Sequence, residues 1–226
     1  MQITETAAGR GPAVKQNTTA TGATSATRMV VSTFGALVAF AGIEHGIGEI
    51  LQGPVAPGAL AIESWPDAKA FEILAGEPAM TVIPNLLVTG VLAVIVALAL
   101  GIWSVRFVER RYGGPVLMAL SVLLLLVGGG FAPPLMGLIL GIAATRIGAV
   151  SHRPPGSVAR AAGRVWRWIL GAGVLGYLAL FPGLVVLSWL LGVSDSSLVL
   201  VLSAVSFAAL LLAPIAARAH DRVQVG

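Results

Sequence analysis

Six mostly apolar stretches, each of roughly 17–25 residues, dominate this 226-residue chain. A hydrocarbon core about 30 Å thick needs about 20 apolar residues in a helix to cross it. The stretches lie at residues 29–52, 80–104, 114–130, 134–150, 168–192 and 197–217. The sequence therefore predicts an all-α, polytopic transmembrane bundle with about six spans.

Composition supports this prediction and excludes several classes of protein. The chain is 57% hydrophobic and 11% charged, whereas soluble domains are about 25% charged. A soluble enzyme, a nucleic-acid-binding module and a disordered protein are therefore excluded. The chain has no Cys, which excludes disulfides, a thiolate nucleophile and cysteine metal sites. Neither of its two lysines follows a glycine, so a phosphate-binding loop ending in Gly-Lys is absent as well.

The membrane domain is expected between two polar ends. Residues 1–28 are rich in Ala, Thr and Gly without apolar periodicity, which predicts a disordered cytoplasmic tail. The transmembrane domain covers residues 29–217 and contains an outer loop at 53–79. Residues 218–226 form a second cytoplasmic tail.

The third and fourth stretches are short, and only residues 131–134 separate them. These residues include Pro133 and Pro134, which are expected to break the helix. Two short spans joined by a tight hairpin are the first interpretation. A single span followed by a re-entrant segment is the alternative.

Basic residues give the orientation, since Lys and Arg concentrate on the cytoplasmic side. All but Lys69 fall in the N-terminal tail, in the loops after the second and fourth stretches, at the start of the fifth or at the C-terminus. They are Arg10, Lys15, Arg28, Arg106, Arg110, Arg111, Arg146, Arg153, Arg160, Arg164, Arg167, Arg218 and Arg222. This pattern predicts a protein of the cytoplasmic membrane with both termini inside. It also explains the net charge of +4 by contact with anionic headgroups rather than with nucleic acid.

The outer loop has the opposite charge. It carries Glu63, Asp67, Glu72 and Glu77 against Lys69 alone. Between Trp65 and Leu74 the apolar spacing predicts a short amphipathic helix at the membrane interface, with Trp65 as its anchor.

The outer half of the first span carries the polar residues of most interest. At about 100° per residue, Gly42, His45, Gly48, Glu49 and Gln52 share one side, with Glu44 at its edge. Apolar residues occupy the opposite side: Phe40, Ile43, Ile47, Ile50 and Leu51. This partition predicts that the polar side faces other helices and the apolar side faces lipid.

Depth makes Glu44 the strongest candidate for a function. It lies about 24 Å along the helix from Arg28, and a charge within the membrane costs at least about 2.5 kcal/mol. If the second span is a neighbour, its outer end adds polar groups to the same region. The predicted solute- or ion-binding pocket consists of Glu44, His45, Glu49, Glu77, Thr81 and Asn85.

Four of the six pocket residues receive a specific role. Glu44 is the protonatable group, and Asn85 forms a neutral hydrogen-bonding wall. His45 and Glu49, four residues apart, form a coordinating or relay pair and are weak candidates for metal ligands. Glu44 and His45 are adjacent in sequence and are expected to face different neighbours. No cofactor is predicted.

Structural explanations compete with these roles. Glu49, Gln52 and Glu77 could mark only where the helices leave the membrane, and His45 with Glu49 could be a polar clasp between helices. Gly42/Gly46 and Gly137/Gly141 are expected to allow close helix packing. Gly128-Gly129-Gly130 is expected to form a helix-ending turn, and Pro182-Gly183 a kink.

Three segments resemble a family of small, uncharacterised prokaryotic membrane proteins. They are the Gly-Ile-Glu-His-Gly run at 42–46 continuing to Gly53, the Pro-Ala-Met-Thr-Val-Ile-Pro-Asn run at 78–85, and residues 128–131 with the following Pro-Pro pair. The resemblance covers the first four spans, roughly residues 30–148. That family has no assigned activity, so the resemblance implies no site residues.

The leading functional hypothesis is binding and permeation of a small solute, proton or cation through the polar pocket. The acidic outer rim would raise the local cation concentration. The main alternative is a non-catalytic accessory or assembly subunit. An intramembrane metalloenzyme is a third and less favoured hypothesis. The expected partners are the lipid bilayer and either further copies of the chain or another membrane protein.

Overall fold

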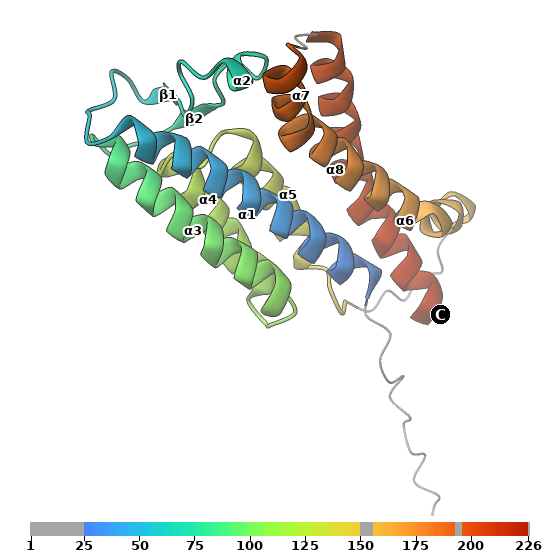
Figure 1. Cartoon of the computed structure of the whole chain (residues 1–226). Coiled ribbons are helices and arrows are strands. Elements are labelled where there is room, and N and C mark those ends of the chain that lie inside the picture. Colours follow the sequence, from blue (N-terminus) through green and yellow to red (C-terminus); the bar gives the residue numbers. More distant parts are fainter. Residues whose placement is uncertain (1–24, 150–155, 193–195, 226) are drawn as a thin grey trace, which may run out of the picture.

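The computed structural model describes residues 25–149, 156–192 and 196–225, and most of this chain is helical (Figure 1). Of the predicted N-terminal tail, residues 1–24 lie outside the described residues. Residues 26–28 already form the first turn of α1, which Ser25 caps.

Four apolar helical segments within the described residues are long enough to cross a membrane, as expected for a membrane protein. They are α1 (Ala26–Gln52), α3 (Leu86–Arg106), the segment formed by α6, η1 and α7 (Ser157–Leu191), and α8 (Ser196–Val225). Large apolar side chains remain exposed along all four, which suits lipid rather than water as the surrounding solvent.

The third and fourth stretches form the predicted hairpin, with helices shorter than expected. Helix α4 (Gly113–Leu126) has 14 residues and α5 (Ala132–Ala144) has 13. Each is therefore about 20 Å long, less than the roughly 30 Å of a hydrocarbon core. Gly128 (φ 92°) and Gly130 (φ 80°) make the turn, as predicted. The two prolines do not break a helix, because they lie in the first turn of α5, where a missing N–H is tolerated.

The second span begins later than predicted. Residues Pro78–Met80 form a strand, β2, that pairs antiparallel with β1 (Ala61–Glu63), and α3 starts only at Leu86. Thr81 forms a further bridge with Val127 in the turn between α4 and α5. The Met80 carbonyl, which a helix here would have left unpaired, accepts a hydrogen bond from the Gly128 nitrogen at 2.9 Å. The outer end of this segment is therefore a small sheet, and the expected helical start at residue 80 is wrong.

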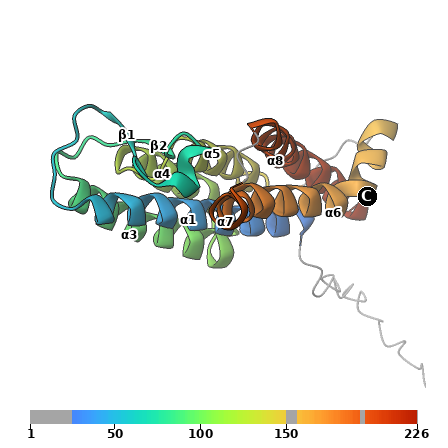
Figure 2. The same cartoon turned by 45° about the horizontal axis from the view of Figure 1, so that its top comes forward.

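The helices form two groups (Figures 1 and 2). Helices α1 and α3 pack together along their length, and the α4–α5 hairpin lies against both. Helices α6 and α8 form the second group, and α8 also contacts α1 and α5. A Cβ at Gly46 of α1 would lie 2.7 Å from the carbonyl oxygen of Gly90 of α3, so these backbones are nearly in contact. The close packing expected at Gly46 is confirmed.

Of two further features, one lies where the sequence predicted it and the other differs from the predicted boundary. The kink expected at Pro182 is confirmed as a π-helical turn, η1 (Ala179–Gly183), which joins α6 (Ser157–Leu178) to α7 (Leu184–Leu191). Helix α8 continues to Val225, so residues 218–225 are helical rather than the expected tail. A long final helix thereby brings its last turns beside the start of α1.

The outer loop contains more regular structure than the one interfacial helix that was predicted. The predicted amphipathic helix is a single turn, α2 (Lys69–Glu72). Trp65 is half-buried and stacks on Phe71, with ring centroids 4.6 Å apart, so it packs within the loop. Together with the β1–β2 pair, this packing holds the loop over the outer end of α1.

Candidate functional site

The predicted orientation of α1 is confirmed. His45 and Glu49 are buried, as are Gly42 and Gly48 on the same side. On the opposite side, 49% of Phe40, 44% of Ile47 and 71% of Leu51 is exposed. The polar side of α1 therefore faces the rest of the protein, and its apolar side is free for lipid.

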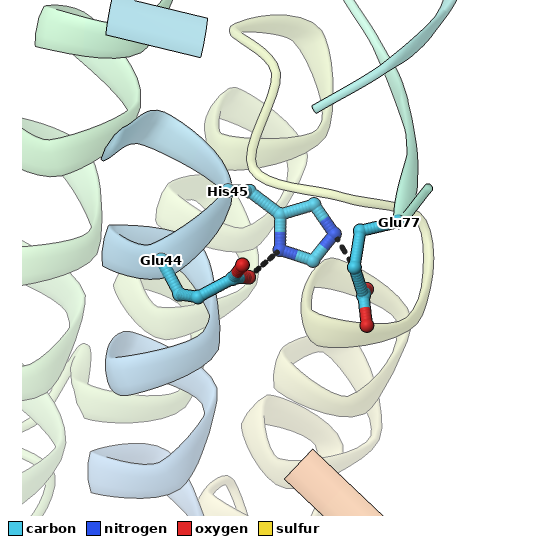
Figure 3. A group of neighbouring side chains, drawn as sticks. All are labelled: Glu44, His45 and Glu77. Atoms are coloured by element: carbon cyan, nitrogen blue, oxygen red, sulfur yellow. Dashed lines mark ion pairs between the residues drawn. The ribbon is translucent and has the colours of Figure 1, made fainter. Parts of the chain in front are cut away.

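His45 lies between two carboxylates (Figure 3). Its Nδ1 is 3.1 Å from Oε2 of Glu44, and its Nε2 is 3.2 Å from Oε2 of Glu77. The imidazole is 2% exposed and each carboxylate side chain 13%. We call Glu44, His45 and Glu77 the His45 cluster. Glu44 and His45 thus act together, and the expectation that they face different neighbours is wrong.

A strained turn brings Glu77 to the imidazole. Ala75 (φ 53°), Gly76 (φ 67°) and Glu77 (φ 54°) all have left-handed backbone conformations. Such conformations are uncommon outside glycine and persist where the surroundings impose them. The Glu77 carbonyl accepts a hydrogen bond from the Ser64 nitrogen at 3.1 Å, which ties this turn to the end of β1. The outer loop is therefore shaped to direct the Glu77 side chain inward.

Hydrogen bonding fixes the tautomer of His45. Nδ1 lies 2.9 Å from the carbonyl oxygen of Ala41, one turn earlier in α1. A carbonyl only accepts, so Nδ1 carries a hydrogen and donates it. Nε2 is left as the nitrogen that faces Glu77. Because both Nε2 and a carboxylate oxygen have lone pairs, this contact needs a positively charged species between them, either a proton or a metal ion.

Glu49 is placed beside the cluster rather than in it. It is fully buried, and its Oε1 accepts a hydrogen bond from Ser64 Oγ at 3.4 Å. Its Oε2 has no hydrogen-bond partner among the described residues. The predicted pairing of His45 with Glu49 is not what the structure contains, because His45 pairs with Glu44 and Glu77 instead.

Thr81 and Asn85 have local structural contacts. The Thr81 hydroxyl is 2.8 Å from the Thr89 hydroxyl, and both residues are buried. The Asn85 side chain accepts a hydrogen bond from the Val88 nitrogen at 3.2 Å and so caps α3. The structure therefore brings Glu77 to His45 as predicted, and it gives Asn85 a capping contact in place of a pocket wall.

The glycine turn contributes to the site in a way that the sequence did not indicate. A Cβ at Gly130 would lie 2.5 Å from Nε2 of His45, and a Cβ at Gly128 would collide with the Glu49 carboxylate. The tip of the α4–α5 hairpin thus packs directly against both polar side chains of α1. The run of three glycines was the only sequence signal of this close approach. From the sequence, these glycines were expected only to form a helix-ending turn.

Two other polar groups at the site were not predicted. Ser64, which follows β1, is fully buried against Glu49. Tyr177 of α6 is 7% exposed, and its hydroxyl has no hydrogen-bond partner among the described residues. Both are isolated polar residues in apolar or loop segments, and no local pattern distinguishes them.

The charges of this region do not balance. It contains three buried or nearly buried carboxylates, those of Glu44, Glu49 and Glu77, and one imidazole. Among the described residues, no Lys or Arg forms an ion pair with these carboxylates. Buried charges require compensation. The site therefore needs added positive charge, as protons or as a bound cation.

An open hollow of about 780 Å³ lies on the outer loop next to this region. Gln52, Glu63, Asp67 and Pro78 contribute to its lining. The Gln52 amide donates to the carbonyl oxygens of Glu63 and Ser64, both at 3.0 Å. Its lining residues Glu63 and Pro78 adjoin Ser64 and Glu77 in sequence, but no residue of the His45 cluster lines the hollow. Its acidic side chains favour cations at its mouth.

Comparison of the chain with protein families, with curated proteins and with solved structures finds no match. The resemblance to a family of small prokaryotic membrane proteins stays a prediction.

Proposed function

We propose that this is a multi-pass protein of the cytoplasmic membrane that binds a small cation at the His45 cluster and allows it to cross. The unbalanced charge carries the proposal, since two carboxylates contact the one imidazole and a third, that of Glu49, is buried beside them. A small cation is the species that would compensate it. The acidic hollow outside the cluster supports entry from the outer face.

The arrangement of basic residues supports a topology with both termini in the cytoplasm. The Gly113 carbonyl at the start of α4 accepts a hydrogen bond from the Trp103 indole nitrogen, near the basic end of α3. The Arg146 carbonyl after α5 accepts one from Arg218 of α8. The α4–α5 hairpin thus starts and finishes on the arginine-rich side. Six crossings, or four with a re-entrant hairpin, place the termini on the same side.

Cation flux into proteoliposomes tests the proposal. Vesicles would carry either a pH-sensitive or a divalent-ion-sensitive dye, and uptake would be followed under an imposed gradient. Glu44→Gln and Glu77→Gln should each reduce the flux at least about tenfold, which corresponds to roughly 1.4 kcal/mol of lost cation binding. Glu72→Gln is the matched control, because Glu72 is an exposed carboxylate of the same loop. Flux no faster than in protein-free vesicles would contradict the proposal.

The closure of the site favours a second candidate, an accessory or assembly subunit. His45 is 2% exposed and Glu49 is fully buried, as in a polar clasp that holds helices together. Under this proposal, purification in a mild detergent should recover a stoichiometric membrane partner or a defined homo-oligomer. Glu77→Gln should then destabilise the folded protein and leave the measured cation flux unchanged. Recovery of a monomer that transports cations would exclude this candidate.

A further inference from the structure

We infer that the cation of the His45 cluster is a divalent transition-metal ion of the Zn²⁺ class. His45 Nε2 and one carboxylate oxygen each of Glu77 and Glu44 would bind it. These three residues offer ligand atoms that all lie within 4.8 Å of one another. The inference deepens the proposed function and rests on it for movement of the ion, whereas binding itself is measured separately.

The hydrogen bond of His45 is the one that a metal-binding histidine requires. A ligating imidazole donates its other N–H to a carboxylate or a backbone carbonyl, which fixes the ring and its tautomer. Here Nδ1 donates to the Ala41 carbonyl at 2.9 Å. Nε2 therefore presents its lone pair, and α1 holds the ring in place.

The spacing of the first two ligand atoms fits a shared ion. Nε2 and the Glu77 oxygen are 3.2 Å apart. That is longer than the 2.7–2.9 Å typical of a charge-assisted hydrogen bond. Two bonds of about 2.0–2.1 Å to one Zn²⁺ would span 3.2 Å at an angle of about 100°, close to tetrahedral.

The glycine turn packs against one face of the His45 ring. A Cβ at Gly130 would lie 2.5 Å from Nε2 and less than 3.0 Å from the two neighbouring ring carbons, a position over the ring face. Glycine, with its left-handed backbone (φ 80°), allows the turn to come this close. The turn thus holds the ring from one face, while the lone pair of Nε2 points along the ring plane.

Glu44 supplies the third ligand by a small movement. Both of its carboxylate oxygens are buried and have no hydrogen-bond partner among the described residues. It lies on the Nδ1 side of the ring and must swing toward Nε2, which breaks the 3.1 Å contact of its Oε2 with Nδ1.

Charge and size favour a transition metal over Mg²⁺ or Ca²⁺. A divalent ion with two carboxylates and a neutral imidazole is electrically neutral, which suits a buried site. Imidazole is a good ligand for Zn²⁺ and its neighbours, whereas Mg²⁺ and Ca²⁺ require six or more oxygen atoms.

Titration with Co²⁺, followed by competition with Zn²⁺, tests the inference. The full chain would be purified without a histidine tag, treated with a chelator and studied in detergent micelles. We expect one Co²⁺ per chain with the visible absorption of a tetrahedral site. His45→Gln and Glu77→Gln should weaken binding at least about 100-fold, since even outer-shell partners contribute about 10–100-fold. Two control variants, His220→Gln and Glu72→Gln, should bind as the wild type does.

His220 is a close control, because its Nδ1 also contacts a backbone carbonyl, that of Gly163, at 3.0 Å. If His45→Gln fails to fold, X-ray absorption of the Zn²⁺-loaded wild type replaces it and should show one imidazole with oxygen ligands. Absence of stoichiometric Co²⁺, or equal binding by His45→Gln, overturns the metal site. Proton flux that depends on Glu44 without metal binding would overturn this inference and leave the proposed function intact. Metal binding without any flux would support this inference and contradict the proposed function.

Discussion

The Asp221 carboxylate lies 2.7 Å from the backbone nitrogen of Ala26, so the last helix of the protein caps the first. The same carboxylate accepts hydrogen bonds from the Thr27 nitrogen at 3.0 Å and from the Ser25 hydroxyl at 2.7 Å. These N–H groups belong to the first turn of α1 and have no partner within that helix. The negative charge also faces the positive end of the α1 dipole. Asp221 therefore joins the two groups of helices.

Replacement of Asp221 should destabilise the whole protein. Asp221→Ala removes three hydrogen bonds at the start of α1, and we expect the free energy of unfolding to fall by about 1–3 kcal/mol. Thermal unfolding in detergent, followed by circular dichroism, measures the change. Arg222→Ala alters the neighbouring exposed residue and is the control. Equal transition temperatures for the two variants would show that the cap contributes nothing.

Local periodicity explains what could be predicted of this fold. The polar side of α1 follows from the spacing of His45 and Glu49 along one helix, and a helix turns by a fixed angle per residue. The apolar lengths likewise predicted the long helices. Pairings between distant segments could not be derived in this way. Glu77 was placed near His45 only by assuming that the second span lies beside the first, and nothing in the sequence near Asp221 indicates that it meets Ala26.

Turn chemistry accounts for the errors at the ends of helices. The pair Pro133-Pro134 was expected to interrupt a helix. In the structure Pro84 precedes the α3 cap, and the pair lies in the first turn of α5. Proline fits the first turn because no N–H is needed there. Residues 78–80 pair with β1, and residues 80–82 contact residues 126–128 at the turn between α4 and α5. These tertiary contacts override their apolar character.

The crossing of α1 and α3 gives a prediction about packing. Gly46→Ala would place a methyl group 2.7 Å from the Gly90 carbonyl oxygen, which is backbone and cannot rotate away. We expect a loss of about 1–3 kcal/mol, as for other overpacked sites. Gly171→Ala in α6 is the matched control, since a Cβ there meets nothing within 4 Å. That variant should be neutral or more stable by up to about 1 kcal/mol, because alanine favours helix. The same thermal measurement compares them, and a less stable Gly171→Ala would contradict the explanation.

Gln52 gives a prediction about the outer loop. Its amide nitrogen donates to the carbonyl oxygens of Glu63 and Ser64 and so attaches the end of β1 to α1. Gln52→Glu keeps the shape and removes the donor, and it also brings a negative charge against two carbonyl groups. Hydrogen exchange of the loop amides around residues 61–65 should become faster, while the amides of α3 keep their rates. Unchanged exchange in the loop would mean that the β1–β2 pair and Trp65 stacking hold it without Gln52.

The chain has no cysteine, so single cysteines report the topology without background. Asp67 lies exposed in the acidic loop, and Arg110 lies exposed after the basic end of α3. Since basic segments stay in the cytoplasm, a membrane-impermeant maleimide should label Asp67→Cys in intact cells. It should label Arg110→Cys only after the membrane is permeabilised. Because α3 lies between the two positions, labelling of both from outside would mean that α3 does not cross. The reverse pattern would place the His45 cluster at the cytoplasmic end and turn the acidic hollow toward the cell interior.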